Sequence, residues 1–232
     1  MAFLFRCIRL VNKLYCNCNS RAVAAMGTYT VLALALYVLF DVNYFIQYIV
    51  LMVRGFLRWR HLKRPLLEPD VTTGRCSLSD LDHMMHMNNA KYLRAFEFGR
   101  AAFGLKNRLW HNARDLRAHL LINAQVVRYR RPVTLFQAFE IHSKVVYWED
   151  RDIFIEQQLI TVIDTFVRAV CLVKMTLVDG SLNDLLTSLD VNPNSKPTPV
   201  PRDIQLFIDY NRASSAKLNA ERDKLLNIKR SD

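Results

Sequence analysis

The chain has 232 residues, of which 51% are hydrophobic, and its formal net charge is +11 at neutral pH. This length suits one domain of ordinary size with additional segments. The basic excess is uneven, because residues 1–64 hold nine Lys or Arg and one acid, whereas residues 65–201 hold sixteen and fifteen. A near-neutral central region argues against nucleic-acid binding. Basic residues that flank an apolar segment suit anionic lipid headgroups better.

An apolar segment runs without a charge from Ala22 to Phe40 and resumes from Tyr44 to Val53. About 20 apolar residues are enough for one helix to cross a bilayer. We therefore predict a membrane anchor at residues 22–53, formed by a single transmembrane helix. A cleaved signal peptide and two short re-entrant halves that break at Asp41 are the alternatives.

The flanking charges and the cysteines bear on topology. Residues 54–64 hold five Lys or Arg and residues 1–21 hold four, which favours a cytosolic domain. Only Cys76 and Cys171 of the five cysteines lie in the globular part, and no Asn-x-Ser/Thr site occurs. Both features suit a reducing compartment. We expect a membrane location, in the endoplasmic reticulum with the domain cytosolic. A secreted or lumenal protein is the alternative.

The elements predicted after the anchor are a strand, a long helix and several further strands. A strand is expected at 71–79, a loop at 80–88, and a helix from about 89 to 104, where apolar residues recur at helical spacing. Alternation of apolar and polar residues then predicts strands at 120–129, 136–148, 153–162 and 166–178. One strand, one buried helix and a strand meander indicate an α+β architecture with an antiparallel sheet around a helix.

Proline residues mark the predicted ends of this domain. Pro65 and Pro69 follow the anchor, and prolines recur between residues 192 and 201, which excludes helix and inner strand there. Residues 203–228 have a loose apolar stripe, which we expect to pack on the domain. The predicted segments are a basic segment at 1–21, an anchor at 22–53, a basic linker at 54–69, a domain at 70–190, a Pro-rich linker at 191–202 and a helical tail at 203–232.

The loop before the predicted helix carries the residues suited to chemistry. Asp82, His86, Asn88, Asn89 and Ala90 lie within nine residues there. A helix N-terminus offers free N–H groups and positive potential to a developing oxyanion. A carboxylate beside it can activate water or attack a carbonyl carbon directly, which suits acyl transfer. A structural role is equally open for the acid and the histidine, and helix capping is the simplest role for the two asparagines.

These residues resemble the signature of the hotdog-fold acyl-CoA and acyl-carrier-protein thioesterases. The resemblance is carried by Ser79-Asp80-Leu81-Asp82, by His86-Met87-Asn88-Asn89-Ala90-Lys91-Tyr92-Leu93, by Glu97, and by the strand ends Tyr129–Pro132 and Trp148–Arg151. It covers roughly residues 70–180, and with its anchor the whole chain is similar to the membrane-anchored animal members. It implies a hotdog fold, in which a five- or six-stranded antiparallel sheet wraps around a long central helix. It also implies a homodimer with active sites at the subunit interface.

The resemblance also implies roles for single residues. Asp82 falls on the carboxylate that acts as general base or nucleophile, and His86 on a second catalytic position. The plant acyl-carrier-protein thioesterase branch has Asn where this chain has Met84, and a Gly is usual where it has Met85. The implied function is hydrolysis of fatty acyl thioesters, with acyl-CoA or an acyl carrier as substrate. The alternative is a non-catalytic acyl-chain-binding or membrane scaffold protein whose loop has drifted.

Other residues have both a functional and a structural interpretation. Glu97 lies on a buried helix face, needs a partner, and is a candidate supporting residue. Arg128, Arg130 and Arg131 are candidates for binding the phosphates of coenzyme A, or form a solvated strand end. No metal is expected, since Asp82 with its neighbouring histidines matches no zinc spacing, and no nucleotide-binding motif indicates a cofactor.

Overall fold

The computed structural model describes residues 25–32, 34–37, 40–59 and 61–231, with side chains described as far as residue 224. The chain divides into two compact units, Met1–Met52 and Val53–Asp232. The first unit contains the helical segment Ala25–Tyr37 and most of helix α2 (Val42–Arg54). The predicted basic segment 1–21 lies outside the described residues.

The helical structure of the apolar segment is interrupted near Asp41. No single helix in the described part of the chain is long and apolar enough to cross a membrane. The bent pair of Ala25–Tyr37 and Val42–Trp59 meets the criteria of length and composition only when its halves are taken together. The prediction of one transmembrane helix at 22–53 is therefore not supported. The backbone N–H of Tyr44 donates to Asp41 Oδ1 at 3.1 Å, so Asp41 caps a new helix instead of continuing the preceding one.

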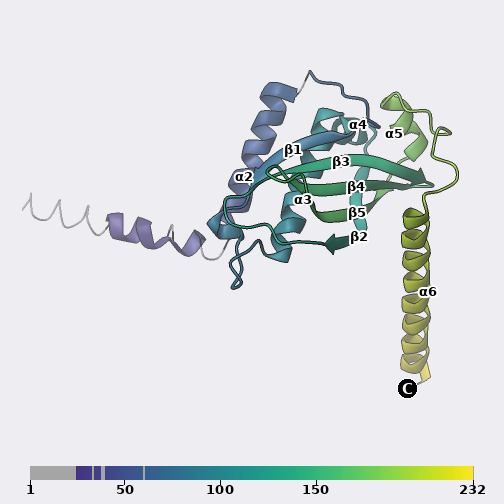
Figure 1. The fold of residues 1–232 in the computed structure, drawn as a ribbon. Coiled ribbons are helices and arrows are strands. Elements are labelled where there is room, and N and C mark those ends of the chain that lie inside the picture. The colour runs from purple at the N-terminus through teal and green to yellow at the C-terminus, as the bar shows by residue number, and fades with distance from the viewer. Residues whose placement is uncertain (1–24, 33, 38–39, 60, 232) are drawn as a thin grey trace, which may run out of the picture. The chain divides into compact units, whose positions relative to one another are not determined.

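The second unit contains a five-stranded antiparallel sheet with the strand order β1-β3-β4-β5-β2 (Figure 1). The strands are β1 (Asp70–Arg75), β2 (His119–Tyr129), β3 (Ala138–Glu149), β4 (Asp152–Thr161) and β5 (Val167–Val178). The predicted meander holds for β3, β4 and β5. It does not hold for β2, which pairs with β5 at the far edge of the sheet, in a register that places Leu120 opposite Leu177.

Helix α3 (Asn89–Lys106) packs against one face of the sheet, which curves around it (Figure 1). Tyr92, Phe96 and Phe103 are buried on the side of the helix that faces the strands. A Cβ atom at Gly99 would lie 2.7 Å from Ile141 Cγ2, so glycine allows the helix to approach β3 closely. The sheet and this helix confirm the predicted α+β architecture.

The first turns of α6 (Arg202–Ser231) pack against part of the opposite face of the sheet, and the helix then extends away from it (Figure 1). Ile204, Phe207 and Ile208 are buried there in a second apolar cluster with three side chains of the sheet, Tyr147, Phe154 and Leu172. The predicted packing of the tail on its own domain is thus confirmed for these turns. Leu218, further along the predicted stripe, is 61% exposed. Two short helices were not predicted, α4 (Leu109–Asp115) and α5 (Leu182–Ser188).

Candidate active site

The predicted catalytic loop is a tight turn that lies between the 3-10 helix η2 (Leu78–Asp80) and α3. Its two ends are joined by an antiparallel bridge between Leu81 and Met87. Within the turn, the N–H of Asp82 donates to the His86 carbonyl at 3.0 Å. The N–H of Met87 donates to the Val133 carbonyl at 2.8 Å, which attaches the loop to the segment before β3. The sequence therefore closes locally into a turn, and the turn is fixed to the sheet.

Within this turn Asp82 and His86 face each other. Oδ1 of Asp82 accepts the N–H of Met84 at 2.8 Å, which stabilises the turn. Oδ2 of Asp82 lies 3.6 Å from Nδ1 of His86, within ion-pair range but beyond a hydrogen bond. In the described part of the chain this buried Nδ1 has no hydrogen-bond partner. One carboxylate oxygen is thus structural, while the other faces an imidazole with an unsatisfied nitrogen.

The N-terminus of α3 follows directly. Asn88 is the N-cap, and its Oδ1 accepts the N–H of Ala90 at 2.9 Å, which confirms the capping interpretation. The N–H of Asn88 donates to the Asp80 carbonyl at 2.8 Å. Two of the three N–H groups predicted to bind an oxyanion, those of Asn88 and Ala90, are therefore already used. The N–H of Asn89 is the remaining one of the set.

Met84 and Met85 lie at the tip of the turn and are 64% and 66% exposed. Met85 has a φ of 61°, a left-handed conformation that glycine adopts readily and that strains a residue with a Cβ. The position where related loops usually have glycine is therefore one where the backbone conformation itself favours glycine.

Two of the three predicted arginines form a cationic cluster around the ring of Phe166. The guanidinium carbons of Arg130 and Arg131 lie 4.7 Å and 4.3 Å from its centroid. Arg168 of β5 joins them at 5.3 Å. The sequence analysis missed Arg168, whose place in the cluster depends on the pairing of β2 with β5. Arg128 is exposed on β2, two residues before Arg130.

The cationic cluster of Arg130, Arg131 and Arg168, called the basic cluster below, lies at the same end of the sheet as the catalytic loop. The Tyr129 hydroxyl, at the end of β2, donates to the Asn89 carbonyl at 3.1 Å. The Val133 N–H donates to the Tyr92 hydroxyl at 2.9 Å. Thr134 forms an antiparallel bridge with His86. The basic cluster is thus attached to the loop that contains Asp82 and His86.

Glu97 lies about two turns further along α3, outside this loop. It is half-buried and acts electrostatically on Arg100, which is 5% exposed. Burial lowers the pKa of the Arg100 guanidinium, and nearby Cys171 and Glu97 oppose that shift. Arg100 donates to Gln157 Oε1 at 2.6 Å. Glu97 therefore belongs with a buried polar network under the helix.

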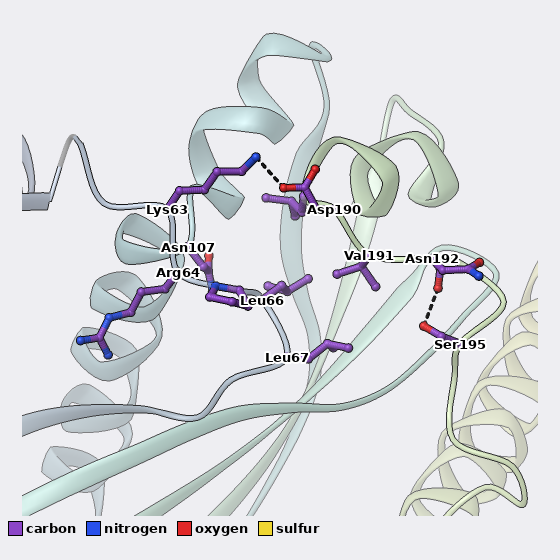
Figure 2. A pocket seen from close by; sticks show the side chains of 11 residues that line it. Lys63, Arg64, Leu66, Leu67, Asn107, Asp190, Val191, Asn192 and Ser195 are labelled. Atoms are coloured by element: carbon purple, nitrogen blue, oxygen red, sulfur yellow. Dashed lines mark hydrogen bonds and ion pairs between the residues drawn. The ribbon is translucent and has the colours of Figure 1, made fainter.

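A pocket of about 340 Å³ lies near the opposite end of α3, at Asn107 (Figure 2). Its walls include Leu66, Leu67 and Val191, and an ion pair between Lys63 and Asp190 lies beside it. None of the predicted catalytic residues lines it.

The fold, an antiparallel sheet around one long helix with a capped loop at the helix N-terminus, is that of the thioesterase-like hotdog proteins. Residues 76–208 match the Thioesterase-like superfamily, and the chain belongs to that superfamily. It is similar to Protein THEM6 of Drosophila melanogaster, at 35% identity over 84% of this chain and 100% of the relative. Protein THEM6 of Danio rerio is 34% identical over 82% of this chain and 92% of its own.

Solved structures of similar fold include YbaW, a probable thioesterase from Escherichia coli. It is 22% identical, with a TM-score of 0.47, and the match covers 52% of this chain and 96% of that chain.

Proposed function

We propose that the protein hydrolyses fatty acyl-CoA thioesters at the end of the sheet where Asp82, His86 and the N-terminus of α3 meet. This proposal rests on the different contacts of the two carboxylate oxygens of Asp82. Its Oδ1 holds the turn through Met84, whereas Oδ2 faces the imidazole of His86 at 3.6 Å. Membership of the thioesterase-like superfamily supports the class of reaction.

In the proposed reaction Asp82 acts as the general base. Oδ2 takes a proton from a water molecule as the water oxygen attacks the thioester carbonyl carbon. The Asn89 N–H, at the positive end of the helix dipole, stabilises the oxyanion. The intermediate collapses by breaking the carbon–sulfur bond, and the leaving thiolate takes up the proton. His86 orients the carboxylate. Direct attack by Asp82 through an acyl anhydride is the alternative route.

The basic cluster suits the phosphates of coenzyme A. Arg130 and Arg131 lie next to the loop, because Val133 and Thr134 pair with it directly. Guanidinium groups form the strongest charge-assisted hydrogen bonds to phosphate. Arg128 extends the same basic surface along β2. Glu97 is assigned a supporting role in helix α3 and no part in the reaction.

We further propose that the apolar segment attaches the enzyme to a membrane of the endoplasmic reticulum, with the domain on the cytosolic side. The distribution of basic residues around residues 22–53 supports this topology.

The enzyme is also proposed to act as a homodimer through β2. This edge strand pairs with β5 on one side, and Leu121, Ile122 and Val126 on it are 56%, 47% and 50% exposed. Exposed apolar edge strands favour pairing with another chain. Sedimentation of the full-length protein should give a dimer, and Val126→Arg should give a monomer.

A second function, acyl-chain binding without turnover, is favoured by one observation, the two exposed methionines at the tip of the loop. Met84→Asn together with Met85→Gly distinguishes the two. A large gain in hydrolysis by this variant indicates a natural site adapted to binding.

Release of free thiol from a panel of acyl-CoAs of different chain length tests the proposed function. The full-length protein should hydrolyse at least one of them, and Asp82→Ala should reduce the rate by about a hundredfold or more. Equal rates in the two proteins contradict the role of Asp82. No hydrolysis by the folded wild type contradicts the enzyme itself and leaves acyl binding.

A further inference from the structure

We propose that residues 53–67, the membrane-proximal segment, bind the surface of an anionic lipid bilayer while they are fixed to the C-terminal end of α3. The inference rests on the membrane attachment within the proposed function and is independent of hydrolysis.

An ionic cluster fixes the segment to the domain. Asp70, at the start of β1, is 3% exposed. Lys106 Nζ, on the last residue of α3, lies 2.9 Å and 2.7 Å from its two carboxylate oxygens. Arg64 binds the same carboxylate at 3.2 Å, and its backbone N–H donates to the Lys106 carbonyl at 3.2 Å. The segment is thus tied to α3 by side chains and by backbone.

Close packing supports the ionic cluster. Gly55 begins a short π-helical turn, η1 (Gly55–Trp59), and is buried. A Cβ atom there would lie 3.0 Å from Leu105 Cδ1, so glycine allows the turn to pack closely on the Leu105 side chain of α3. Lys106 Nζ lies 5.1 Å from the ring centroid of Trp59, and Leu66 is 1% exposed. The turn and the residues after it therefore rest on the domain.

The segment also has exposed side chains, which are of two kinds, apolar and basic. The apolar ones are Val53, Phe56, Leu57, Leu62 and Leu67, with exposures of 49%, 65%, 68%, 37% and 43%. The basic ones are Arg54 and Arg58, since Lys63 pairs with Asp190 and Arg64 with Asp70, and residues 53–67 contain no acid. Figure 2 shows Lys63 reaching Asp190 and Arg64 extending in another direction.

A bilayer surface uses both kinds of side chain at once. Aromatic and aliphatic groups enter the boundary between headgroups and acyl chains, while Lys and Arg remain at the anionic headgroups. An acidic protein or a nucleic acid would pair with the basic residues but leave Phe56 and Leu57 in water. The apolar segment predicted as an anchor, residues 22–53, ends at the first residue of the membrane-proximal segment. These features favour lipid.

The location of this surface also suits catalysis. It lies at the C-terminal end of α3, and the candidate active loop lies at the N-terminal end of the same helix, 18 residues away. At 1.5 Å per residue the helix is about 27 Å long. Lipid binding at one end therefore leaves the other end open to substrate.

The test uses the full-length protein in nanodiscs of phosphatidylcholine, with or without phosphatidylserine. An environment-sensitive fluorophore is attached to Leu57→Cys, in a background where Cys7, Cys16 and Cys18 are serine. Cys76 and Cys171 are buried and do not compete for the label. The matched control is Leu218→Cys on α6, which is 61% exposed.

The label at position 57 should shift its emission to the blue and be protected from a water-soluble quencher, more strongly with phosphatidylserine. Each basic residue near an anionic surface contributes about 1 kcal/mol, or roughly a fivefold change in partitioning. Arg54→Gln with Arg58→Gln should thus reduce about thirtyfold the partitioning of the label into the bilayer surface, as measured by its protection from the quencher. Arg151→Gln with Arg222→Gln should leave this partitioning unchanged. The label at 218 should stay accessible.

Two results overturn the proposal. Full accessibility at position 57 in both nanodiscs means that the segment remains in water, even though the anchor still holds the protein in the disc. Deep protection that is the same in both lipids means that the residue belongs to a spanning helix.

Discussion

Oδ2 of Asp82 lies 3.6 Å from Nδ1 of His86, across one turn of backbone that the other oxygen of the same carboxylate stabilises. The pair differs from a second Asp–His pair of the same spacing, Asp115 and His111, in which the atoms lie 2.9 Å apart on the surface of α4. In the described part of the chain, the buried Nδ1 of His86 makes no hydrogen bond. The first pair thus leaves an imidazole nitrogen unsatisfied, whereas the second forms a close contact at the surface.

Backbone strain at the loop predicts an unusual response to glycine. Met85 has a φ of 61°, whereas Met84 is not among the residues with positive φ. Relief of left-handed strain, about 1 kcal/mol, should offset the entropy lost by glycine, so Met85→Gly should leave the free energy of unfolding unchanged or higher. Met84→Gly should lower it by about 0.5–1 kcal/mol. Urea unfolding followed by tryptophan fluorescence measures both, and an equal loss in the two variants contradicts the strain.

The buried ionic cluster predicts a large loss of stability. Asp70→Asn leaves Lys106, whose side chain is 13% exposed, without its carboxylate. Removing one partner of a buried pair typically costs about 3 kcal/mol or more. Glu68→Gln, an exposed carboxylate two residues earlier, should change the free energy of unfolding by less than about 0.5 kcal/mol. Urea unfolding of both variants measures the difference. Similar small effects would show that the cluster does not hold the segment.

The basic cluster predicts a dependence on the nucleotide part of the substrate. Arg130→Ala with Arg131→Ala should raise KM for an acyl-CoA by roughly tenfold or more, with little change in kcat, because charge-assisted hydrogen bonds to phosphate are lost. KM for the corresponding acyl-pantetheine, which lacks the nucleotide, should not change. Arg151→Ala, in the turn between β3 and β4 at the opposite end of the sheet, is the control. A parallel rise for both substrates would indicate a structural effect.

Cys171 predicts a loss of stability at alkaline pH. It is 0% exposed, and burial raises the pKa of its thiol from 9.0 to about 11. Between these values the unfolded state has lost the proton and the folded state retains it. The contribution is therefore complete below pH 9 and is lost as pH rises through 11. Two pKa units correspond to about 2–3 kcal/mol. The free energy of unfolding, measured with urea at pH 8 and at pH 11, should fall less in Cys171→Ala than in the wild type, by about that amount. Equal falls in the two proteins contradict the raised pKa.

Helix α3 and its cap were predictable because their signals are local. Asn88 is followed by apolar residues at helical spacing, and the structure begins the helix at Asn89 as expected. The predicted first strand was too long at its end. Ser77 donates through its backbone and its hydroxyl to Asp80 Oδ2 at 2.8 Å and 2.7 Å, and this capping interaction bends the chain away from the sheet after Arg75.

The features of the fold and the site that the sequence did not predict depend on contacts that its local patterns do not contain. The pairing of β2 with β5 brings Arg168 to Arg130, and no spacing in the sequence contains that pairing. The sequence pattern predicted three backbone N–H donors for an oxyanion. The structure removes Ala90 from this set, because its N–H donates to the Asn88 side chain. Asp41 interrupted the predicted anchor through a cap to Tyr44, although the apolar composition on both sides favoured continuity.

Thiol release by Asp82→Asn tests the central claim most directly. Asparagine keeps the Oδ1 that accepts the Met84 N–H, so the turn remains and only the basicity of the carboxylate is lost. The control is Asp115→Asn, an exposed aspartate that also faces a histidine four residues away. We predict a rate about a hundredfold lower for Asp82→Asn and unchanged for Asp115→Asn. Wild-type rates in Asp82→Asn would contradict the proposal that this carboxylate performs the hydrolysis.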